Sequence, residues 1–280
     1  MSEIHKYAAL TSFFIRSSVK SRGFLAISVF TTSVALILLY LTLDLGSGGN
    51  NTITPLAYLY GRISGVLQVT LTYFLWSVPF ATLVVFSTAF LSAFTFGADM
   101  GGNMRFFVYS LPARRSTLLY AKFSAAFAVS SAILGIYYGI EGSFLGIHFK
   151  AVPPMDFFVS LLLSLLLIGT IISITFFIGM FMKNPTFVVI AFLSIYFIVM
   201  DTMGIASEIL VGKLPSFLLS TAGGVVTEVF SGINLLPFGQ AGTIAGADSA
   251  SIILDVIVLF LYLTASLVSV YILHNVREVR

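Results

Sequence analysis

Four acidic residues lie in or near long apolar stretches, where charge is costly: Glu141, Asp201, Glu208 and Asp255. A charged side chain at the centre of a bilayer costs about 3 kcal/mol, so a truly central carboxylate would indicate a substrate or proton pathway. Glu141, Glu208 and Asp255 fall near the ends of their stretches, where water is available. Asp201 lies deepest by residue count and is a candidate pathway residue, although we favour a structural, hydrogen-bonded position for it.

Other residues offer little for catalysis. The chain has no cysteine, and its three histidines, His5, His148 and His274, lie far apart and give no metal-ligand spacing. The motifs His-Glu-x-x-His and Gly-x-x-x-x-Gly-Lys-(Ser/Thr) do not occur, and a lone Asp201 cannot perform two-carboxylate chemistry. We therefore predict that the chain is not an enzyme and that it has no catalytic residue, no metal site and no cofactor of its own.

Residues 97–116, here called the coupling segment, interrupt the apolar pattern with aromatic side chains beside charges. We expect a compact helical turn over 104–109, ended by Ser-Leu-Pro. Aromatic residues rimmed by charge are typical of protein-docking surfaces, and an anchor among lipid headgroups is the alternative. The residues expected to dock a partner are Asp99, Met104, Arg105, Phe106, Phe107, Tyr109, Ser110, Leu111, Pro112, Arg114 and Arg115.

Composition indicates which elements position these residues. Hydrophobic residues make up 58% of the 280 residues and charged residues 9%, with a mean hydropathy of +1.05. A soluble domain of this size cannot bury so much apolar side chain, so the surplus must face lipid. A membrane-spanning helix needs roughly 20 apolar residues. We predict an all-α integral membrane protein, a single transmembrane domain over 1–280, with spans at about 23–45, 66–96, 117–144, 156–182, 186–210 and 251–274.

The distribution of Lys and Arg predicts the orientation. With the N-terminus inside, eleven of the 14 basic residues are cytoplasmic, and Arg62, Lys150 and Lys213 are outside. We expect a multi-pass protein of the cell membrane with both termini in the cytoplasm. Because the basic residues flank spans, they do not indicate nucleic-acid binding.

Two segments outside the spans are predicted to form helices at the membrane surfaces. Residues 3–22 place apolar and basic side chains on opposite arcs of a helix, which predicts an amphipathic helix on the inner membrane surface, with contacts through Lys6, Phe14, Arg16 and Lys20. Residues 211–250 are apolar but broken by Pro and Gly, which predicts short helices at or dipping into the outer interface.

The aromatic residues of the fourth and fifth spans form a further set. They could line an apolar pathway at a dimer interface, although lipid contact or helix packing is the interpretation we favour. The set is Phe176, Phe177, Phe181, Phe187, Phe192, Tyr196 and Phe197.

At the coupling segment the chain resembles permeases of the ABC-2 export family. The central family pattern Leu-Ser-x-Pro-x-x-Arg is matched by 109–112 and Arg115, and the start of the next span by Leu-Leu-Tyr-Ala-Lys at 118–122. Asp99 stands for the first acidic position, whereas the second acid and the usual Gly-Thr pair are replaced within 101–104. The family pattern also includes an amphipathic N-terminal helix, six spans and re-entrant outer helices between spans five and six, so the resemblance covers the whole chain.

This resemblance implies a mechanism. Such permeases form homodimers or heterodimers, and each copy docks a separate ATP-binding subunit on its coupling helix. ATP and Mg would bind on that subunit, because this chain has no phosphate-binding loop. Nucleotide-driven closure would push the 104–109 turn and rock the bundle between inward-facing and outward-facing states. Export from the cytoplasm and export from the inner leaflet both stay open.

Other functions remain possible from the sequence. An ion-coupled secondary transporter would need convergent polar groups or broken helices near the midplane. Gly169, Gly179 and Asp201 give only weak support for such a site. An intramembrane enzyme lacks its motifs. A non-transport membrane assembly protein has no distinguishing sequence feature.

Overall fold

The structure is a computed structural model that describes residues 3–46, 65–97, 114–150, 152–182, 184–211, 215, 217–230 and 249–276. All regular elements among these residues are helical. Six helical stretches are long and apolar enough to cross a membrane, which confirms the predicted six-span, all-α fold. Five of them are α2 (Arg22–Gly46), α4 (Gly65–Gly97), α6 (Arg115–Phe149), α7 (Met155–Gly179) and α12 (Ser249–Val276). The remaining span is composite.

That span, the fifth, is built from three consecutive elements. It comprises α8 (Pro185–Leu193), the π-helical stretch η1 (Ser194–Met200) and α9 (Asp201–Val211). Asn184 caps the start, because its side chain accepts a hydrogen bond from the backbone N–H of Thr186 at 3.0 Å. Pro185 occupies the first turn, where a missing N–H costs nothing. The short connection keeps α7 and α8 in contact, as expected for a tight hairpin.

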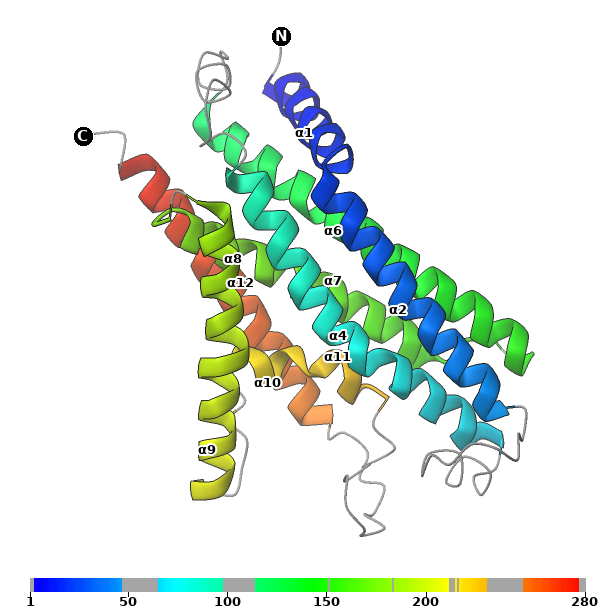
Figure 1. Cartoon of the computed structure of the whole chain (residues 1–280). Coiled ribbons are helices and arrows are strands. Elements are labelled where there is room, and N and C mark those ends of the chain that lie inside the picture. Colours follow the sequence, from blue (N-terminus) through cyan, green and yellow to red (C-terminus); the bar gives the residue numbers. More distant parts are fainter. Residues whose placement is uncertain are drawn as a thin grey trace.

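The centre of the bundle is formed by α4, α6 and α7, which pack on one another (Figure 1). Trp76, Tyr137 and Phe176 are among the largest fully buried side chains there. Pro79 does not interrupt α4. Small residues allow close helix approach: a Cβ at Gly169 of α7 would lie 2.9 Å from Leu263 of α12. The outer helices α2 and α12 expose many of their apolar side chains, as lipid-facing helices do.

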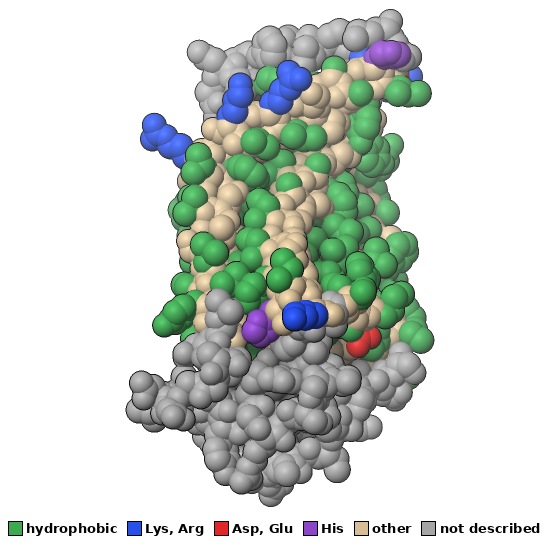
Figure 2. Space-filling model, turned by 90° about the vertical axis from the view of Figure 1, so that its right-hand side faces the viewer, with side chains coloured by type: hydrophobic (Ala, Val, Ile, Leu, Met, Phe, Trp, Pro, Cys, Tyr) green, Lys and Arg blue, Asp and Glu red, His purple; other side chains and the backbone are tan. Residues whose placement is uncertain are grey.

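The two ends of the bundle differ in charge. Helix α1 (Glu3–Val19), the start of α6 and the end of α12 lie at the same end, here called the basic end (Figure 1). Figure 2 shows Lys and Arg side chains gathered mainly at this end, above a broad apolar band. The described basic side chains at the surface of this end are Lys6, Arg16, Lys20, Arg22 and Arg114. Lys122 is buried there, and Lys150 lies at the opposite end of α6.

Near the opposite end, two short helices are inserted between the fifth and sixth spans. These are α10 (Leu219–Gly223) and α11 (Val225–Glu228). Helix α10 packs against η1 and α12, and α11 packs against α4, α7 and α12. Leu219, Ala222, Val225 and Val226 are buried. Short helices were expected in 211–250, and in the described part they are enclosed by the bundle rather than exposed at a surface.

Candidate functional site

Most of the predicted docking residues lie outside the described residues. This applies to Asp99, Met104, Arg105, Phe106, Phe107, Tyr109, Ser110, Leu111 and Pro112. Arg114 is exposed and precedes the first turn of α6, and Arg115 begins that helix. The structure therefore describes the two ends of the coupling segment, at Gly97 of α4 and in the first turn of α6, which begins at Arg115.

Helix α1 packs along the start of α6, next to the coupling segment. Leu10 and Phe14 are buried against Leu118 and Ala121. Tyr7 adds a polar contact, because its hydroxyl lies 2.5 Å from that of Ser124. Phe14, which the sequence assigns to the membrane surface, is only 3% exposed and contacts protein. This is a correction of its expected role, and it arises because α6 supplies an apolar surface that the sequence pattern of α1 cannot reveal.

Lys6, Arg16 and Lys20 remain outside this buried face, as expected for the polar side of an amphipathic helix. Lys6 pairs with Glu3 at 3.2 Å, and this hydrogen bond holds the pKa of the Glu3 carboxyl below its usual range. Glu3 also accepts a hydrogen bond from Thr117 of α6 at 3.3 Å. Helix α1 is thus joined to α6 by both apolar and polar contacts.

Lys122 of α6 contacts both α1 and the end of α4, beside the coupling segment. Its side chain is buried, and its Nζ donates a hydrogen bond to the backbone oxygen of Phe96 at 3.1 Å. The same Nζ lies 5.7 Å from the ring centre of Phe14 and 5.4 Å from that of Phe96. A cation is favourable here, because the last carbonyl groups of α4 carry partial negative charge. Lys122 therefore connects α6 to α1 and to the end of α4.

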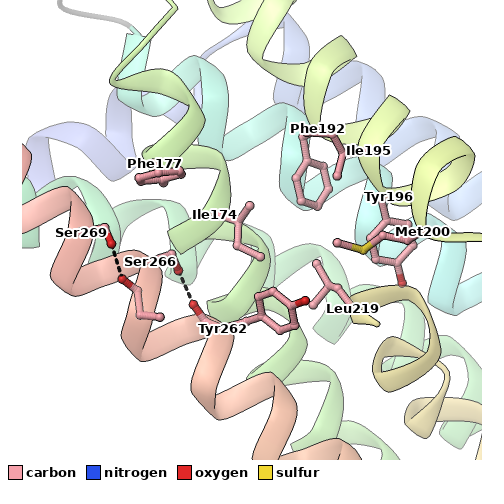
Figure 3. Close-up of a pocket in the computed structure, with 11 residues that line it drawn as sticks. Ile174, Phe177, Phe192, Ile195, Tyr196, Met200, Leu219, Tyr262, Ser266 and Ser269 are labelled. Atoms are coloured by element: carbon pink, nitrogen blue, oxygen red, sulfur yellow. Dashed lines mark hydrogen bonds between the residues drawn. The ribbon is translucent and has the colours of Figure 1, made fainter. Parts of the chain in front are cut away.

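A pocket of about 290 Å³ lies between the fourth, fifth and sixth spans. Figure 3 shows side chains of α7 and α12 on one side, those of α8 and η1 on the other, and Leu219 of α10 between them. The lining is mainly apolar, with hydroxyl groups contributed chiefly by α12. The lining residues are Ile174, Phe177, Phe192, Ile195, Tyr196, Met200, Leu219, Tyr262, Ala265, Ser266 and Ser269.

The fifth span changes its winding beside this pocket. Ile195, Tyr196 and Met200 line the pocket from η1, which has π-helical geometry. A π-helical stretch widens the helix and redirects side chains, and such stretches are frequent at functional sites. The hydroxyl of Tyr196 is directed toward α10 (Figure 3), where it lies against Gly223.

The aromatic set of the fourth and fifth spans is divided by the structure. Phe177, Phe192 and Tyr196 line the pocket, and Phe176 is fully buried in the core. The other three residues are exposed: Phe181, Phe187 and Phe197.

The contribution of α12 was not anticipated. Tyr262, Ser266 and Ser269 follow a spacing of four and three residues, so they share one helix face. A polar stripe in an apolar helix was the signal that could have revealed this wall of the pocket.

Glu141 is more buried than its position near the end of a span suggested. It is 2% exposed, and its Oε1 atom has no hydrogen-bond partner. The phenols of Tyr73, Tyr137 and Tyr138 lie near this carboxyl group. These phenols belong to a packed aromatic cluster, in which the rings of Tyr73 and Phe157 meet edge to face. The expected access to water is therefore wrong, because Glu141 is buried inside the bundle.

An acidic pair lies near the end of the bundle opposite the basic end. Burial raises the pKa of the Glu228 carboxyl of α11, and the nearby Asp255 carboxyl of α12 raises it further. Asp255 is itself buried, in contrast to its expected contact with water. Asp201 is half-buried at the start of α9 and does not line the pocket.

Within the described residues, no cluster of three or more His, Cys, Asp or Glu residues could hold a metal ion. Neither the known protein-family models nor the curated proteins include a match to this chain.

Proposed function

We propose that the chain is the membrane-spanning permease subunit of an ATP-driven exporter of the ABC-2 type. In this proposal the basic end is cytoplasmic, the protein lies in the cell membrane, and the coupling segment docks a separate ATP-binding subunit that carries ATP and Mg. A second permease copy, identical or related, and membrane lipids complete the assembly.

The observation that carries the proposal is the position of Lys122 at the base of the coupling segment. The connection between α4 and α6 starts and ends at the two helices that Lys122 joins. Helix α1 packs at the same corner of the bundle, because the ring of Phe14 lies next to the Lys122 Nζ. Force applied to the connection would therefore reach α1, α4 and α6 together. Such a shared attachment suits a segment that transmits movement from a docked partner to a helix bundle.

The order of elements gives further support. An amphipathic helix precedes six membrane-spanning stretches, and two short helices are inserted between the fifth and sixth. This order corresponds to the family pattern that the coupling segment resembles. Buried short helices between two spans are tolerated in a membrane only when protein encloses their backbone, as the packing of α10 and α11 provides.

Affinity purification from detergent-solubilised membranes tests the proposal. The tagged wild type should recover an ATP-binding subunit, and Phe106→Ala/Phe107→Ala should lose it. The matched control is Phe181→Ala/Phe187→Ala, which removes two exposed aromatic side chains beside the connection between α7 and α8. This connection also lies at the basic end, and the control variant should retain the partner.

Thermal unfolding shows that each variant is folded. Absence of any ATP-binding subunit from folded wild-type protein would overturn the proposal and favour an ion-coupled transporter or an assembly protein.

A further inference from the structure

The pocket between α7, η1, α10 and α12 opens between the fifth and sixth spans. Both spans pack against α10, and both α8 and α12 pack against α7, whereas η1 and α12 share no substantial contact within the described residues. Ile195 and Ala265 are exposed at the rim, and Ser269 beside them is half-buried. Beyond the rim, Ile198 is 64% and Leu261 59% exposed, so the opening lies among lipid-facing apolar side chains.

Most polar groups of the wall already have partners inside the protein. The Ser266 hydroxyl lies 2.6 Å from that of Ser173, and the Ser269 hydroxyl donates to the backbone oxygen of Ala265 at 2.7 Å. The Tyr262 hydroxyl donates to the backbone oxygen of Phe217 at 3.1 Å. A buried water needs two to four polar partners, so this wall suits neither water nor a polar ligand.

The surrounding lipid bilayer supplies an apolar occupant for the pocket. An empty gap in a bilayer would deprive its lining of dispersion contacts, and hydrocarbon chains of lipid lie at the rim. Transfer from bilayer to pocket brings no hydrophobic gain, so binding depends on packing. Ser269 lies seven positions after Tyr262 in α12, so the wall between them is about 10 Å long along the helix.

The pocket has two distinguishable ends. Phe177 and Ser269 lie toward the basic end, since α7 and α12 both run toward it. Leu219 of α10 lies at the deeper end, near Met200 and Tyr196 (Figure 3). A chain that enters from the side would be stopped there, because α10 bridges η1 and α12.

We propose that this pocket binds one hydrocarbon chain of a membrane amphiphile taken sideways from the leaflet at the basic end. The terminal methyl group lies against Leu219, and the headgroup lies beyond Ser269. The role of this amphiphile as transported substrate rests on the proposed export function, whereas its binding does not.

Photo-crosslinking in nanodiscs of phosphatidylcholine and phosphatidylglycerol tests the binding. A phosphatidylcholine with a diazirine at the chain terminus should label Leu219 and Met200, and one with a diazirine near the headgroup should label Phe177 and Ser269. Ala265→Phe fills the pocket from its rim and should reduce the deep labelling at least about fivefold. Leu261→Phe enlarges an exposed side chain of the same helix and should leave the labelling unchanged.

Ser269→Phe is a second rim variant, for use if Ala265→Phe unfolds. Labelling spread evenly over the exposed faces of α12 and η1 would overturn the proposal. The proposal also fails if protein instead of lipid occupies the pocket, shown by crosslinks from a photoreactive side chain at residue 265 to residues 231–248 or to a second copy.

The substrate role is tested on the complex with the ATP-binding subunit. An added single-chain amphiphile should stimulate ATP hydrolysis by the wild type and by Leu261→Phe, and Ala265→Phe should abolish this stimulation. Equal stimulation of Ala265→Phe would overturn the substrate role. Failure to find an ATP-binding subunit would instead overturn the export function and leave the crosslinking result standing.

Discussion

The hydroxyl of Tyr196 in η1 lies against the α-carbon of Gly223 in α10, so closely that a Cβ at residue 223 would overlap it. This contact joins the π-helical stretch of the fifth span to the short helix that closes the pocket. It also gives Gly223 a steric role, since the backbone of α10 can approach η1 only without a side chain at this position.

Gly223→Ala should therefore lower the free energy of unfolding by about 1–3 kcal/mol, the usual cost of overpacking. Tyr196→Phe removes the overlapping oxygen and should restore most of the loss in the double variant. Unfolding in mild detergent, followed by helical circular dichroism, measures both. Gly139→Ala is the control, because a Cβ there meets nothing within 4 Å, and it should be neutral or stabilising by up to about 1 kcal/mol. A Gly223→Ala variant as stable as Gly139→Ala would contradict the steric role.

Lys122→Met should loosen the corner formed by α1, α4 and α6. Methionine keeps much of the apolar stem but loses the hydrogen bond to Phe96, at a cost of about 1–3 kcal/mol for a charged donor. Limited proteolysis within 98–113 should become faster. Lys6→Met is the control, since this partly exposed lysine pairs with Glu3 and the change should cost at most about 1 kcal/mol. Unchanged stability and cleavage of Lys122→Met would show that the corner does not depend on the lysine.

Much of this architecture follows from the sequence, for identifiable reasons. Six spans are readable because each is a long apolar stretch, and hydropathy does not depend on which helices are neighbours. The burial of Phe14 and Glu141 does depend on neighbours, namely α6 for the former and the aromatic cluster around Tyr73 for the latter. Local periodicity could not supply either one.

The sequence likewise indicated only part of the pocket. Phe177, Phe192 and Tyr196 were recognised as possible pathway residues from aromatic content, but the opposing wall on α12 was not. The π-helical geometry of η1 is a shift in backbone hydrogen bonding within an ordinary apolar stretch, and residue types do not reveal it. Closure by Leu219 depends on how α10 folds back between two spans, which is a tertiary property.

Glu141→Leu should raise the free energy of unfolding by about 1 kcal/mol or more. The buried Oε1 has no partner, and an apolar side chain of similar volume removes the cost of burying an unpaired acid. Tyr138→Phe is a matched change in the same cluster, and it should destabilise by about 1 kcal/mol because it loses a 2.7 Å hydrogen bond to Ser160. Reversible unfolding in detergent compares the two. Destabilisation by Glu141→Leu would reveal a favourable partner for the carboxyl group.

Glu228 should make stability depend on pH in the acidic range. Burial raises the pKa of its carboxyl in the folded protein, so the protonated form is favoured there. This contribution is fully present below the unfolded value of about 4.3 and is lost as pH rises through the folded value. Glu228→Gln should therefore flatten the fall in unfolding free energy as pH rises above the unfolded value of about 4.3.

Glu3→Gln provides a control of opposite sign. Lys6 lowers the pKa of Glu3, so its contribution is present above the unfolded value and is lost as pH falls through the folded value. Denaturant titrations at several pH values measure both slopes. Identical pH profiles for Glu228→Gln and the wild type would contradict the raised pKa.

Ser173 and Ser266 should couple α7 to α12 by a modest amount. Their hydroxyl oxygens lie 2.6 Å apart, and hydrogen bonds between helices in membranes contribute about 0.6 kcal/mol on average. Ser266→Ala and Ser173→Ala should each destabilise by about that amount, and the double variant should lose less than their sum. Because this hydroxyl already has a partner, Ser266→Ala should leave the labelling of Leu219 by the chain-terminal diazirine lipid unchanged. Reduced labelling would show that Ser266 bonds to the bound molecule, and the pocket would then belong to a polar ligand rather than to a hydrocarbon chain.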